Sequence, residues 1–378
     1  MKKVISLALS MLMLVMLFAG CQSDSKPASS SAGNTATTPA SSGSAESAPA
    51  APVASGEKLK VGMMPYTVNV PAQYALDQGW FAEAGLDVEF VMFPNGTPMN
   101  ESLAAKQIDM GVAGTAAVFS MVNGISTLVY ETNTAGGMGL YVRADSPLAQ
   151  VKGQIADKPD VLGSADTIRG IKVLGALGTV SQYTTIKYAE LFGVKESEFE
   201  QIHMEFAQAL QAFLAGEGDA ISVPPPFSFQ AAESGAVRAV SFEEAAGLTM
   251  KDGIIARKDV LADRRDDVVK FVQVYEKACD AFVKDPALRK EFSIKFFGAN
   301  GFEYDDKLME QEASVRDYIN QDFIKQDGYV FGDSYTELAN FFTTAGKIEE
   351  ELLENLDTCF DPTVIKDAFG IDVKVIGK

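Results

Sequence analysis

The apolar residues of this chain recur with two different periods, and the two periods alternate along the sequence. Short apolar or alternating runs at 58–65, 86–93 and 109–114 are typical of strands. The segments that follow these runs, at 71–85, 97–106 and 115–123, repeat apolar residues at three- and four-residue spacing, which is typical of helices, and Gly85 ends the first of them. Strands and helices in succession predict a mostly parallel sheet covered by helices.

A second set of the same units follows the first. The strand-like stretches 170–177, 199–206 and 219–224 alternate with helical patterns at 181–192 and 207–216, and beyond about residue 250 long amphipathic helices dominate. Two α/β lobes are therefore predicted. We expect the chain to return to the first lobe, so that two crossovers form a hinge. The expected division is 58–144 with 245–378 in lobe 1, and 145–244 in lobe 2.

The first 57 residues differ from the rest of the chain in composition. Residues 1–20 combine a basic start with an apolar run and a small-residue ending before Cys21. This pattern favours a cleaved lipoprotein signal peptide over an uncleaved membrane anchor, because the run is short for a bilayer span. Residues 21–57 are rich in Ser, Ala and Pro, which predicts a disordered tether. We expect an exported protein, anchored by acyl chains such as palmitate at Cys21, on the outer face of the cell membrane or facing the periplasm.

Composition narrows the function classes. A formal net charge of −19 argues against nucleic acid and against electrostatic binding to anionic lipid. The chain has one histidine, and no cluster has the spacing of a metal site or of a nucleophile with its base, so no metal, no cofactor and no catalysis are predicted. Cys279 and Cys359 either form a disulfide or fill the core, and the sequence leaves this open. We expect a monomer.

Small polar residues stand where predicted strands give way to helices. The turns "FPNGTP" and "AGTAA" offer Thr97 and Thr115 as caps or donors, and Gly96 and Gly114 allow close backbone approach; Thr179 follows a strand of the second set. In open α/β sheets ligands gather at the carboxyl ends of strands, where helices present free N–H groups. Converging turns would form an anion cradle. The alternative is that each turn simply caps its helix.

Three stretches, in this order, carry a family resemblance: "GWFAEAGLDVEFVMFPNGTPMNESLAAKQIDMGVAG", "ALGTVSQYTTIKYAELFGV" and "FLAGEGDAISVPPPFSFQAAESG". From about Lys58 to Gly370 the chain resembles the substrate-binding lipoproteins of ABC importers in the nitrate/sulfonate/taurine group, which also includes binders of thiamine and riboflavin precursors. The resemblance implies a type II periplasmic-binding-protein fold, with a ligand clamped between hinged lobes and passed to a membrane permease. The ligand-contact positions that it implies are Tyr66, Thr67, Asn69, Asn95, Gly96, Thr97, Gly114, Thr115, Ala116, Asn133, Thr134, Thr179, Ser181, Gln182, Tyr183, Pro226 and Phe227.

The ligand class has more than one interpretation. None of these turns contains Lys, Arg or His, which disfavours nitrate and bicarbonate and favours a small organic anion such as a sulfonate or taurine. Tyr66, Tyr183 and Phe227 would equally stack on an aromatic acid or on a thiamine or riboflavin precursor. A lipid-tethered sensor subunit is a further alternative, and a pyrimidine-synthase-like enzyme is less expected because such chemistry needs histidine and cysteine groups. The acidic run 305–317 is predicted to be a solvated helix face.

Overall fold

The computed structural model describes residues 56–377. The predicted signal peptide, the lipidation site Cys21 and nearly all of the predicted tether lie outside the described residues. In the described part of the chain, no helix combines the length and the hydrophobicity that crossing a bilayer requires.

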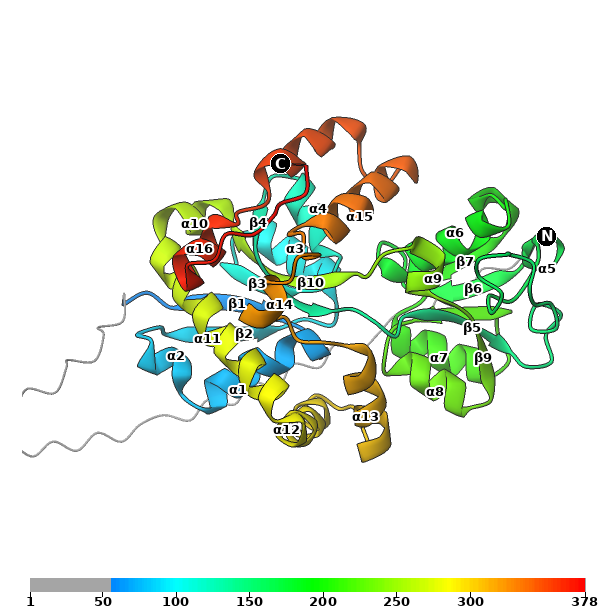
Figure 1. Cartoon of the computed structure of the whole chain (residues 1–378), viewed down its shortest axis with the longest axis horizontal. Coiled ribbons are helices and arrows are strands. Elements are labelled where there is room, and N and C mark those ends of the chain that lie inside the picture. Colours follow the sequence, from blue (N-terminus) through cyan, green and yellow to red (C-terminus); the bar gives the residue numbers. More distant parts are fainter. Residues whose placement is uncertain (1–55, 378) are drawn as a thin grey trace, which may run out of the picture. The chain divides into compact units, whose positions relative to one another are not determined.

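The described residues form two five-stranded sheets (Figure 1). The first has the order β2 (Val88–Met92), β1 (Leu59–Met63), β3 (Met110–Ala113), β10 (Lys251–Arg257) and β4 (Ser126–Thr134). β1 pairs in parallel with β2 and β3, whereas β10 runs antiparallel between β3 and β4. Its lobe contains η1 (Thr67–Asn69), α1 (Val70–Asp77), α2 (Trp80–Glu83), α3 (Gly96–Ala104), α4 (Ala117–Val122), α10 (Lys258–Asp263), α11 (Arg265–Lys284), α12 (Pro286–Ala299), α13 (Asp306–Val315), α14 (Gln321–Ile324), α15 (Asp333–Thr344), η3 (Glu350–Thr358) and α16 (Thr363–Phe369).

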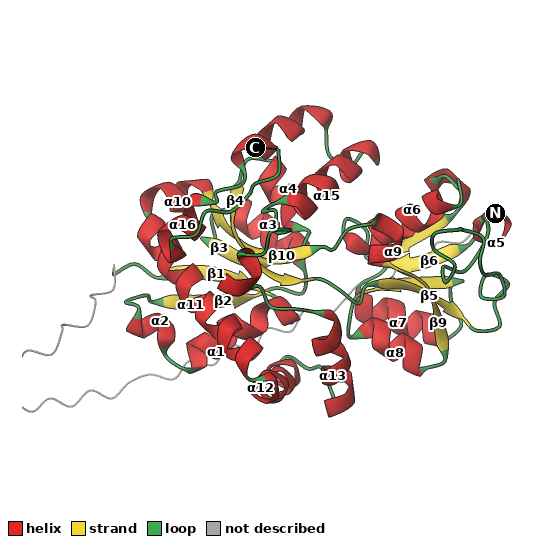
Figure 2. Cartoon of the chain, viewed as in Figure 1, coloured by secondary structure: helices red, strands yellow, loops and turns green. Residues whose placement is uncertain are grey.

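The second sheet has the same plan. Its order is β7 (Glu200–His203), β6 (Lys172–Gly175), β8 (Ala220–Val223), β5 (Gly139–Arg143) and β9 (Ala236–Ser241), with β5 antiparallel to both of its neighbours. Helices lie on both faces of each sheet (Figure 2), which explains why the central strands are buried on both sides. The second lobe contains α5 (Ala165–Ile168), α6 (Val180–Leu191), η2 (Glu196–Glu198), α7 (Phe206–Leu214), α8 (Phe227–Glu233) and α9 (Phe242–Ala246).

The two crossover strands correct the sequence prediction. Residues 139–143 were assigned to lobe 1, which was expected to end at residue 144, but they form β5 of the second sheet, where Tyr141 pairs with Ile221 and Arg238. Each sheet is mixed: four strands run in one direction, as the mostly parallel prediction expects, and the strand that enters from the other lobe, β10 or β5, runs antiparallel to both of its neighbours. Pairing between strands far apart in the chain leaves no local pattern in the sequence of either strand. The other bounds of the lobes stay predictions.

The two connections between the sheets lie side by side. The chain leaves β4 through residues 135–138 and returns through residues 247–250, and the backbone N–H of Ala135 donates to the carbonyl of Met250 at 2.7 Å. A paired crossover of this kind is the arrangement of a hinge, in which a few backbone positions change while the sheets stay rigid.

The predicted helices lie close to the observed ones, with one division. Those expected at 97–106, 115–123 and 181–192 correspond to α3, α4 and α6. The single helix expected near 71–85 is split into α1 and α2 at Gly79, which has a φ of +74°. Such a left-handed residue cannot continue a helix, and glycine adopts it without a steric penalty.

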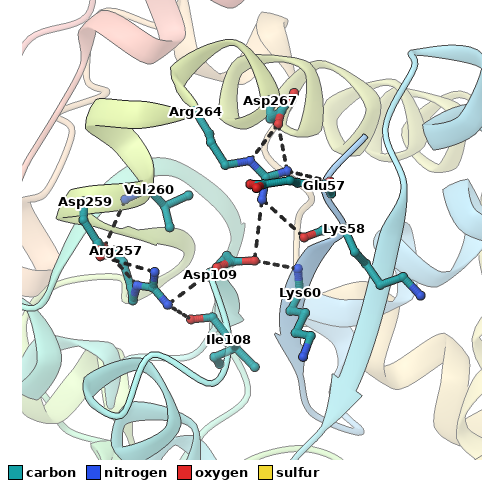
Figure 3. A network of polar contacts seen from close by, with 10 residues as sticks. All are labelled: Glu57, Lys58, Lys60, Ile108, Asp109, Arg257, Asp259, Val260, Arg264 and Asp267. Atoms are coloured by element: carbon teal, nitrogen blue, oxygen red, sulfur yellow. Dashed lines mark hydrogen bonds and ion pairs between the residues drawn. The ribbon is translucent and has the colours of Figure 1, made fainter. Parts of the chain in front are cut away.

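The first described residues are held beside α11 (Figure 3). The Arg264 guanidinium donates to the carbonyls of Glu57 at 2.9 Å and of Lys58 at 3.2 Å. Asp109 accepts from the backbone N–H of Lys60 at 2.9 Å, and its carboxylate lies 3.5 Å from the guanidinium of Arg257. These contacts fix β1 at its first residues, so the carboxylate of Asp109 has a structural role.

Both cysteines of the described chain are buried. Cys279 lies on α11 and is unpaired, so it forms no disulfide with Cys359 at the end of η3. Burial raises the pKa of the Cys279 thiol well above its ordinary value. These side chains belong to the hydrophobic core.

Candidate functional site

A cavity of about 100 Å³ lies between the two sheets and is lined by residues of both lobes. This volume is enough for several water molecules or for a small organic molecule. The turns that follow β1, β2, β3, β6 and β8 all reach it, which is where ligands bind in open α/β sheets. Of the positions expected from the sequence, those that line the cavity are Tyr66, Thr67, Asn95, Gly96, Gly114, Thr115, Ala116 and Thr179.

Several expected contact residues do not line the cavity. Thr97 is exposed at the start of α3. The Ser181 hydroxyl donates to the carbonyl of Ser222 at 2.6 Å, and the Gln182 amide bonds to Gly178 and Glu196. The Tyr183 ring packs against Phe341 of α15, with 4.2 Å between the ring centroids. The remaining five that do not line the cavity are Asn69, Asn133, Thr134, Pro226 and Phe227. Of these, Asn133 donates to the lining residue Asp252.

The polar turns serve mainly as helix caps. The Asn95 side chain accepts from the backbone N–H of Thr97 at 2.9 Å and caps α3, so the cap lies two residues before the expected one. Thr179 caps α6 and also donates its hydroxyl to the carbonyl of Ala176 at 2.7 Å. A Cβ on Gly96 would lie 2.7 Å from Cβ of Ala116, so this glycine is needed for packing of two turns. The Thr115 hydroxyl makes no hydrogen bond to the described residues and lines the cavity.

The charged residues of the cavity come from segments that the sequence analysis did not connect with it. Asp252 at the start of β10 and Arg316 at the end of α13 both line the cavity. Nη1 of Arg316 lies 3.5 Å from Oδ2 of Asp252, and Nε lies 3.1 Å from Oε1 of Glu312. We call Asp252, Glu312 and Arg316 the cavity cluster. Glu312 and Arg316 are 4% and 7% exposed, so the prediction that 305–317 is a solvated face is wrong at these two positions.

Neighbouring side chains hold the cavity cluster in place. Asn133 donates to Oδ2 of Asp252 at 3.0 Å, and the Thr67 hydroxyl donates to Oε1 of Glu312. Burial raises the pKa of Asp252, and the nearby guanidinium of Arg316 opposes this shift. The sequence does show that Glu312 and Arg316, four residues apart, share a helix face. It gives no sign that this face is buried against a turn more than two hundred residues earlier.

A β-bulge separates the cavity cluster from a second charged group. Asp252 pairs with Asn133 in the β10–β4 ladder, but Gly253 pairs with Glu131, so Thr132 is an extra residue. Because of this extra residue, Glu131 and Asn133 point to opposite faces of the sheet although they are two residues apart. Glu131 therefore meets Lys251, with 3.5 Å between carboxylate and ammonium, and Lys251 also pairs with Asp333. We call Glu131, Lys251 and Asp333 the hinge cluster, since Lys251 directly follows the second crossover.

Apolar groups form most of the remaining lining. The Tyr66 hydroxyl is held by the carbonyl of Pro94 at 3.1 Å, and burial raises the pKa of Tyr66 to about 12, so this ring is neutral at physiological pH. Phe297 is stacked on Tyr304 with 4.3 Å between the ring centroids, which fixes its orientation. The other apolar lining residues are Met64, Val68, Ala135, Met138, Val180, Phe206, Pro224 and Pro225.

The lobes touch one another beside the cavity. Asn95 of the first lobe donates to Glu205 of the second at 3.1 Å, and Lys307 pairs with Glu233 at 2.7 Å. Together with the packing of Tyr183 on Phe341, these contacts hold the cavity in a closed arrangement. Across residues 56–377, no three His, Cys, Asp or Glu side chains are grouped as a metal site would require.

Comparison with known proteins places these features in a family. Residues 54–294 match the model of the NMT1-like family. A candidate ABC transporter periplasmic binding protein of Brachyspira hyodysenteriae is 30% identical over 313 residues, which cover 82% of this chain and 90% of that protein.

Solved structures show the same fold. The periplasmic aliphatic sulphonate binding protein of Escherichia coli matches with a TM-score of 0.63 at 15% identity, over 82% of this chain and 93% of that one. The periplasmic nitrate-binding protein of Synechocystis PCC 6803 matches with a TM-score of 0.62 at 14% identity, over 84% and 89% of the two chains. The expected two-lobe α/β fold of the periplasmic binding proteins is thereby confirmed.

Proposed function

This chain belongs to the NMT1-like family, and from that premise we propose that it is the substrate-binding component of an ABC importer. Its homologue in Brachyspira hyodysenteriae is named as an ABC transporter binding protein, which supports a binding function rather than an enzymatic one. The observation that carries the proposal is the cavity itself, which strand-end turns of both lobes line beside a paired crossover. Ligand binding would favour the closed arrangement, which the permease would recognise.

For the ligand, we propose a small organic molecule with an aromatic or heterocyclic body. The rings of Tyr66, Phe206 and Phe297 and the neighbouring aliphatic side chains support this choice, since they offer apolar surface to a ligand. A small organic anion such as a sulfonate or taurine is the second candidate. The guanidinium of Arg316 favours it, as does the sulphonate-binding structural relative.

Thermal unfolding of the purified full chain tests the binding function. Ring compounds are expected to raise the melting temperature in a concentration-dependent way, and alkyl sulfonates and nitrate less so, because a ligand of the native state stabilises it. Phe297→Ala should abolish the shift. Phe296→Ala is the matched control, since Phe296 is the adjacent residue, is equally buried and does not line the cavity. Equal ligand shifts in the two variants would place the ligand elsewhere.

We further propose that the protein is exported and held at the membrane through an acylated Cys21, as a monomer tethered by residues 21–57. Incorporation of a clickable palmitate analogue into the wild-type protein, but not into Cys21→Ser, is the expected result. Labelling of both proteins would contradict this anchor. The alternative of a sensor subunit would be favoured if ligand addition recruited a membrane kinase in place of a permease in cross-linking experiments.

A further inference from the structure

We infer that the polar end of the ligand is a positively charged nitrogen group, such as an amidinium or ammonium, and that Asp252 of the cavity cluster binds it. This inference rests on the proposed binding function and names the charge of its ligand. A cationic ligand differs from the small organic anion that the residues of the turns favour.

The first support is an unused acceptor on the cavity wall. Asp252 is 6% exposed and lines the cavity. Its Oδ2 accepts from Asn133 and faces Arg316, whereas its Oδ1 accepts no hydrogen bond from the described residues. Oδ1 lies beside Gly114 in the turn after β3, and a Cβ on that glycine would be 3.5 Å away. Oδ1 is therefore an acceptor that the cavity can reach, and a ligand N–H group could donate to it directly.

The second support is the charge balance. Arg316 contributes one positive charge, and Asp252 and Glu312 contribute two negative charges at 3.5 and 3.1 Å from it. Oε2 of Glu312 is buried and has no hydrogen-bond partner. At the rim, Glu205 adds a further carboxylate through its contact with Asn95. Among the described residues that line the cavity, Arg316 is the one cationic side chain.

These charges weigh against an anion. Nη1 of Arg316 lies 3.5 Å from Oδ2 of Asp252, so an anionic ligand bound to Arg316 would also lie near that carboxylate, and the repulsion would offset part of the attraction. A cationic group at Oδ1 gains from both carboxylates and is repelled by one guanidinium. Arg316 then serves to keep Asp252 ionised and oriented, because removal of the guanidinium would leave two buried carboxylates close together.

Three ring compounds of nearly equal shape test the inference: benzamidine, benzamide and benzoate, which are cationic, neutral and anionic. Calorimetric titration of the purified full chain should give the affinity order benzamidine, benzamide, benzoate. In Asp252→Asn the affinity for benzamidine should fall by about tenfold or more, whereas that for benzamide should change by less than about threefold. Benzoate should bind more tightly to this variant, because Arg316 loses one of its two carboxylates.

Controls separate the charge effect from damage to the fold. Glu276→Gln replaces a buried carboxylate of α11 that accepts from Gln321, away from the cavity, and should leave all three affinities unchanged. If Asp252→Asn fails to fold, Glu312→Gln should still weaken benzamidine selectively, and the wild-type affinity order remains decisive.

Two outcomes overturn the inference and differ in what they say of the binding function. Tighter binding of benzoate or of alkyl sulfonates than of benzamidine would show an anion site and leave the importer function standing. If none of the ring compounds and none of the sulfonates binds, both the charge assignment and the proposed ligand class fail. Equal affinity of benzamidine for wild type and Asp252→Asn would also remove Asp252 from the site.

Discussion

The hinge cluster and the cavity cluster have the same composition and different consequences. Each contains two carboxylates and one cation, and consecutive residues of β10, Lys251 and Asp252, contribute to them from opposite faces of the sheet. In the hinge cluster, Lys251 also donates to the carbonyl of Val330, and the second carboxylate, Asp333, is partly exposed to solvent. In the cavity cluster both carboxylates are buried. Oε2 of Glu312 has no hydrogen-bond partner, as is also true of Oε2 of Glu131 in the hinge cluster, but only in the cavity cluster does a carboxylate without a full set of donors, that of Asp252, line the cavity.

Access therefore decides between a structural and a binding role for the same residue types. In the hinge cluster, solvent reaches the second carboxylate, Asp333, and the cluster fixes the fold. In the cavity cluster, the surplus negative charge faces a cavity and is available to a ligand.

Removing the cation of the hinge cluster should have the largest effect. Lys251→Met leaves the fully buried Glu131 without its ion-pair partner, and the free energy of unfolding should fall by about 3 kcal/mol. Urea unfolding followed by circular dichroism measures this. Lys258→Met, at a half-buried lysine that bonds Thr358, is the control and should change the free energy of unfolding by less than about 0.5 kcal/mol. Equal losses in the two variants would contradict a structural role for the hinge cluster.

The pH dependence of stability should also report the hinge cluster. Burial raises the pKa of Glu131 from 4.5 to about 7, although Lys251 opposes the shift. Because the folded-state pKa is above that of the unfolded chain, the contribution is complete below about pH 4.5 and is lost as pH rises to about 7. The free energy of unfolding should fall by about 3 kcal/mol over this range from this group, and Glu131→Gln should remove that part. Identical pH profiles for wild type and variant would exclude Glu131 as the cause.

Removing the cation of the cavity cluster should cost less. Arg316→Met leaves Asp252 and Glu312 unpaired, but water in the cavity can solvate the Asp252 carboxylate, so we expect a loss of about 2 kcal/mol in urea unfolding. The variant should bind benzoate even more weakly. A loss as large as that of Lys251→Met would mean that the cavity cluster is as closed as the hinge cluster.

Acid should weaken cation binding before it unfolds the protein. Burial raises the pKa of Asp252, with Arg316 opposing the shift, and Glu312 and Tyr335 are the other titratable groups that act on it. Protonation removes the charge that binds benzamidine, so affinity should fall as pH drops from neutral into the acid range, by about tenfold once the carboxyl is neutral. Titration calorimetry at several pH values measures this. A constant affinity for benzamidine over the range would contradict the role of Asp252.

The smallest expected effect distinguishes Thr115 from Thr97, two threonines that occupy similar strand-to-helix turns in the sequence. Thr115→Val removes a hydroxyl that lines the cavity, and we expect the bound ring compound to lose about 1 kcal/mol of affinity. Thr97→Val changes an exposed position on α3 and should leave affinity unchanged. A loss in Thr97→Val with none in Thr115→Val would reverse the assignment.

The turns illustrate how much of the site was predictable. Eight of the expected contact positions line the cavity, because strand ends of one sheet necessarily meet at one edge. Within each turn the prediction was less accurate, since Asn95 and Thr97 are both capping residue types and a shift of two residues in the start of the helix decides between them. Tyr183 was misplaced for the same kind of reason, because its ring turns toward α15, a partner far away in the sequence.

The alternation of strands and helices, the two-lobe plan and the turns at the strand ends can all be predicted from the sequence, because periodicity and capping are local properties of the chain. Only the tertiary structure decided that β5 pairs in the second sheet, that Glu312 and Arg316 are buried, and that Asp252 meets them. These facts depend on contacts between segments far apart in sequence. A charged helix face has the same sequence pattern whether it is exposed to water or packed against another segment. The bulge at Thr132, which separates the two clusters, exists only in the pairing of β4 with β10.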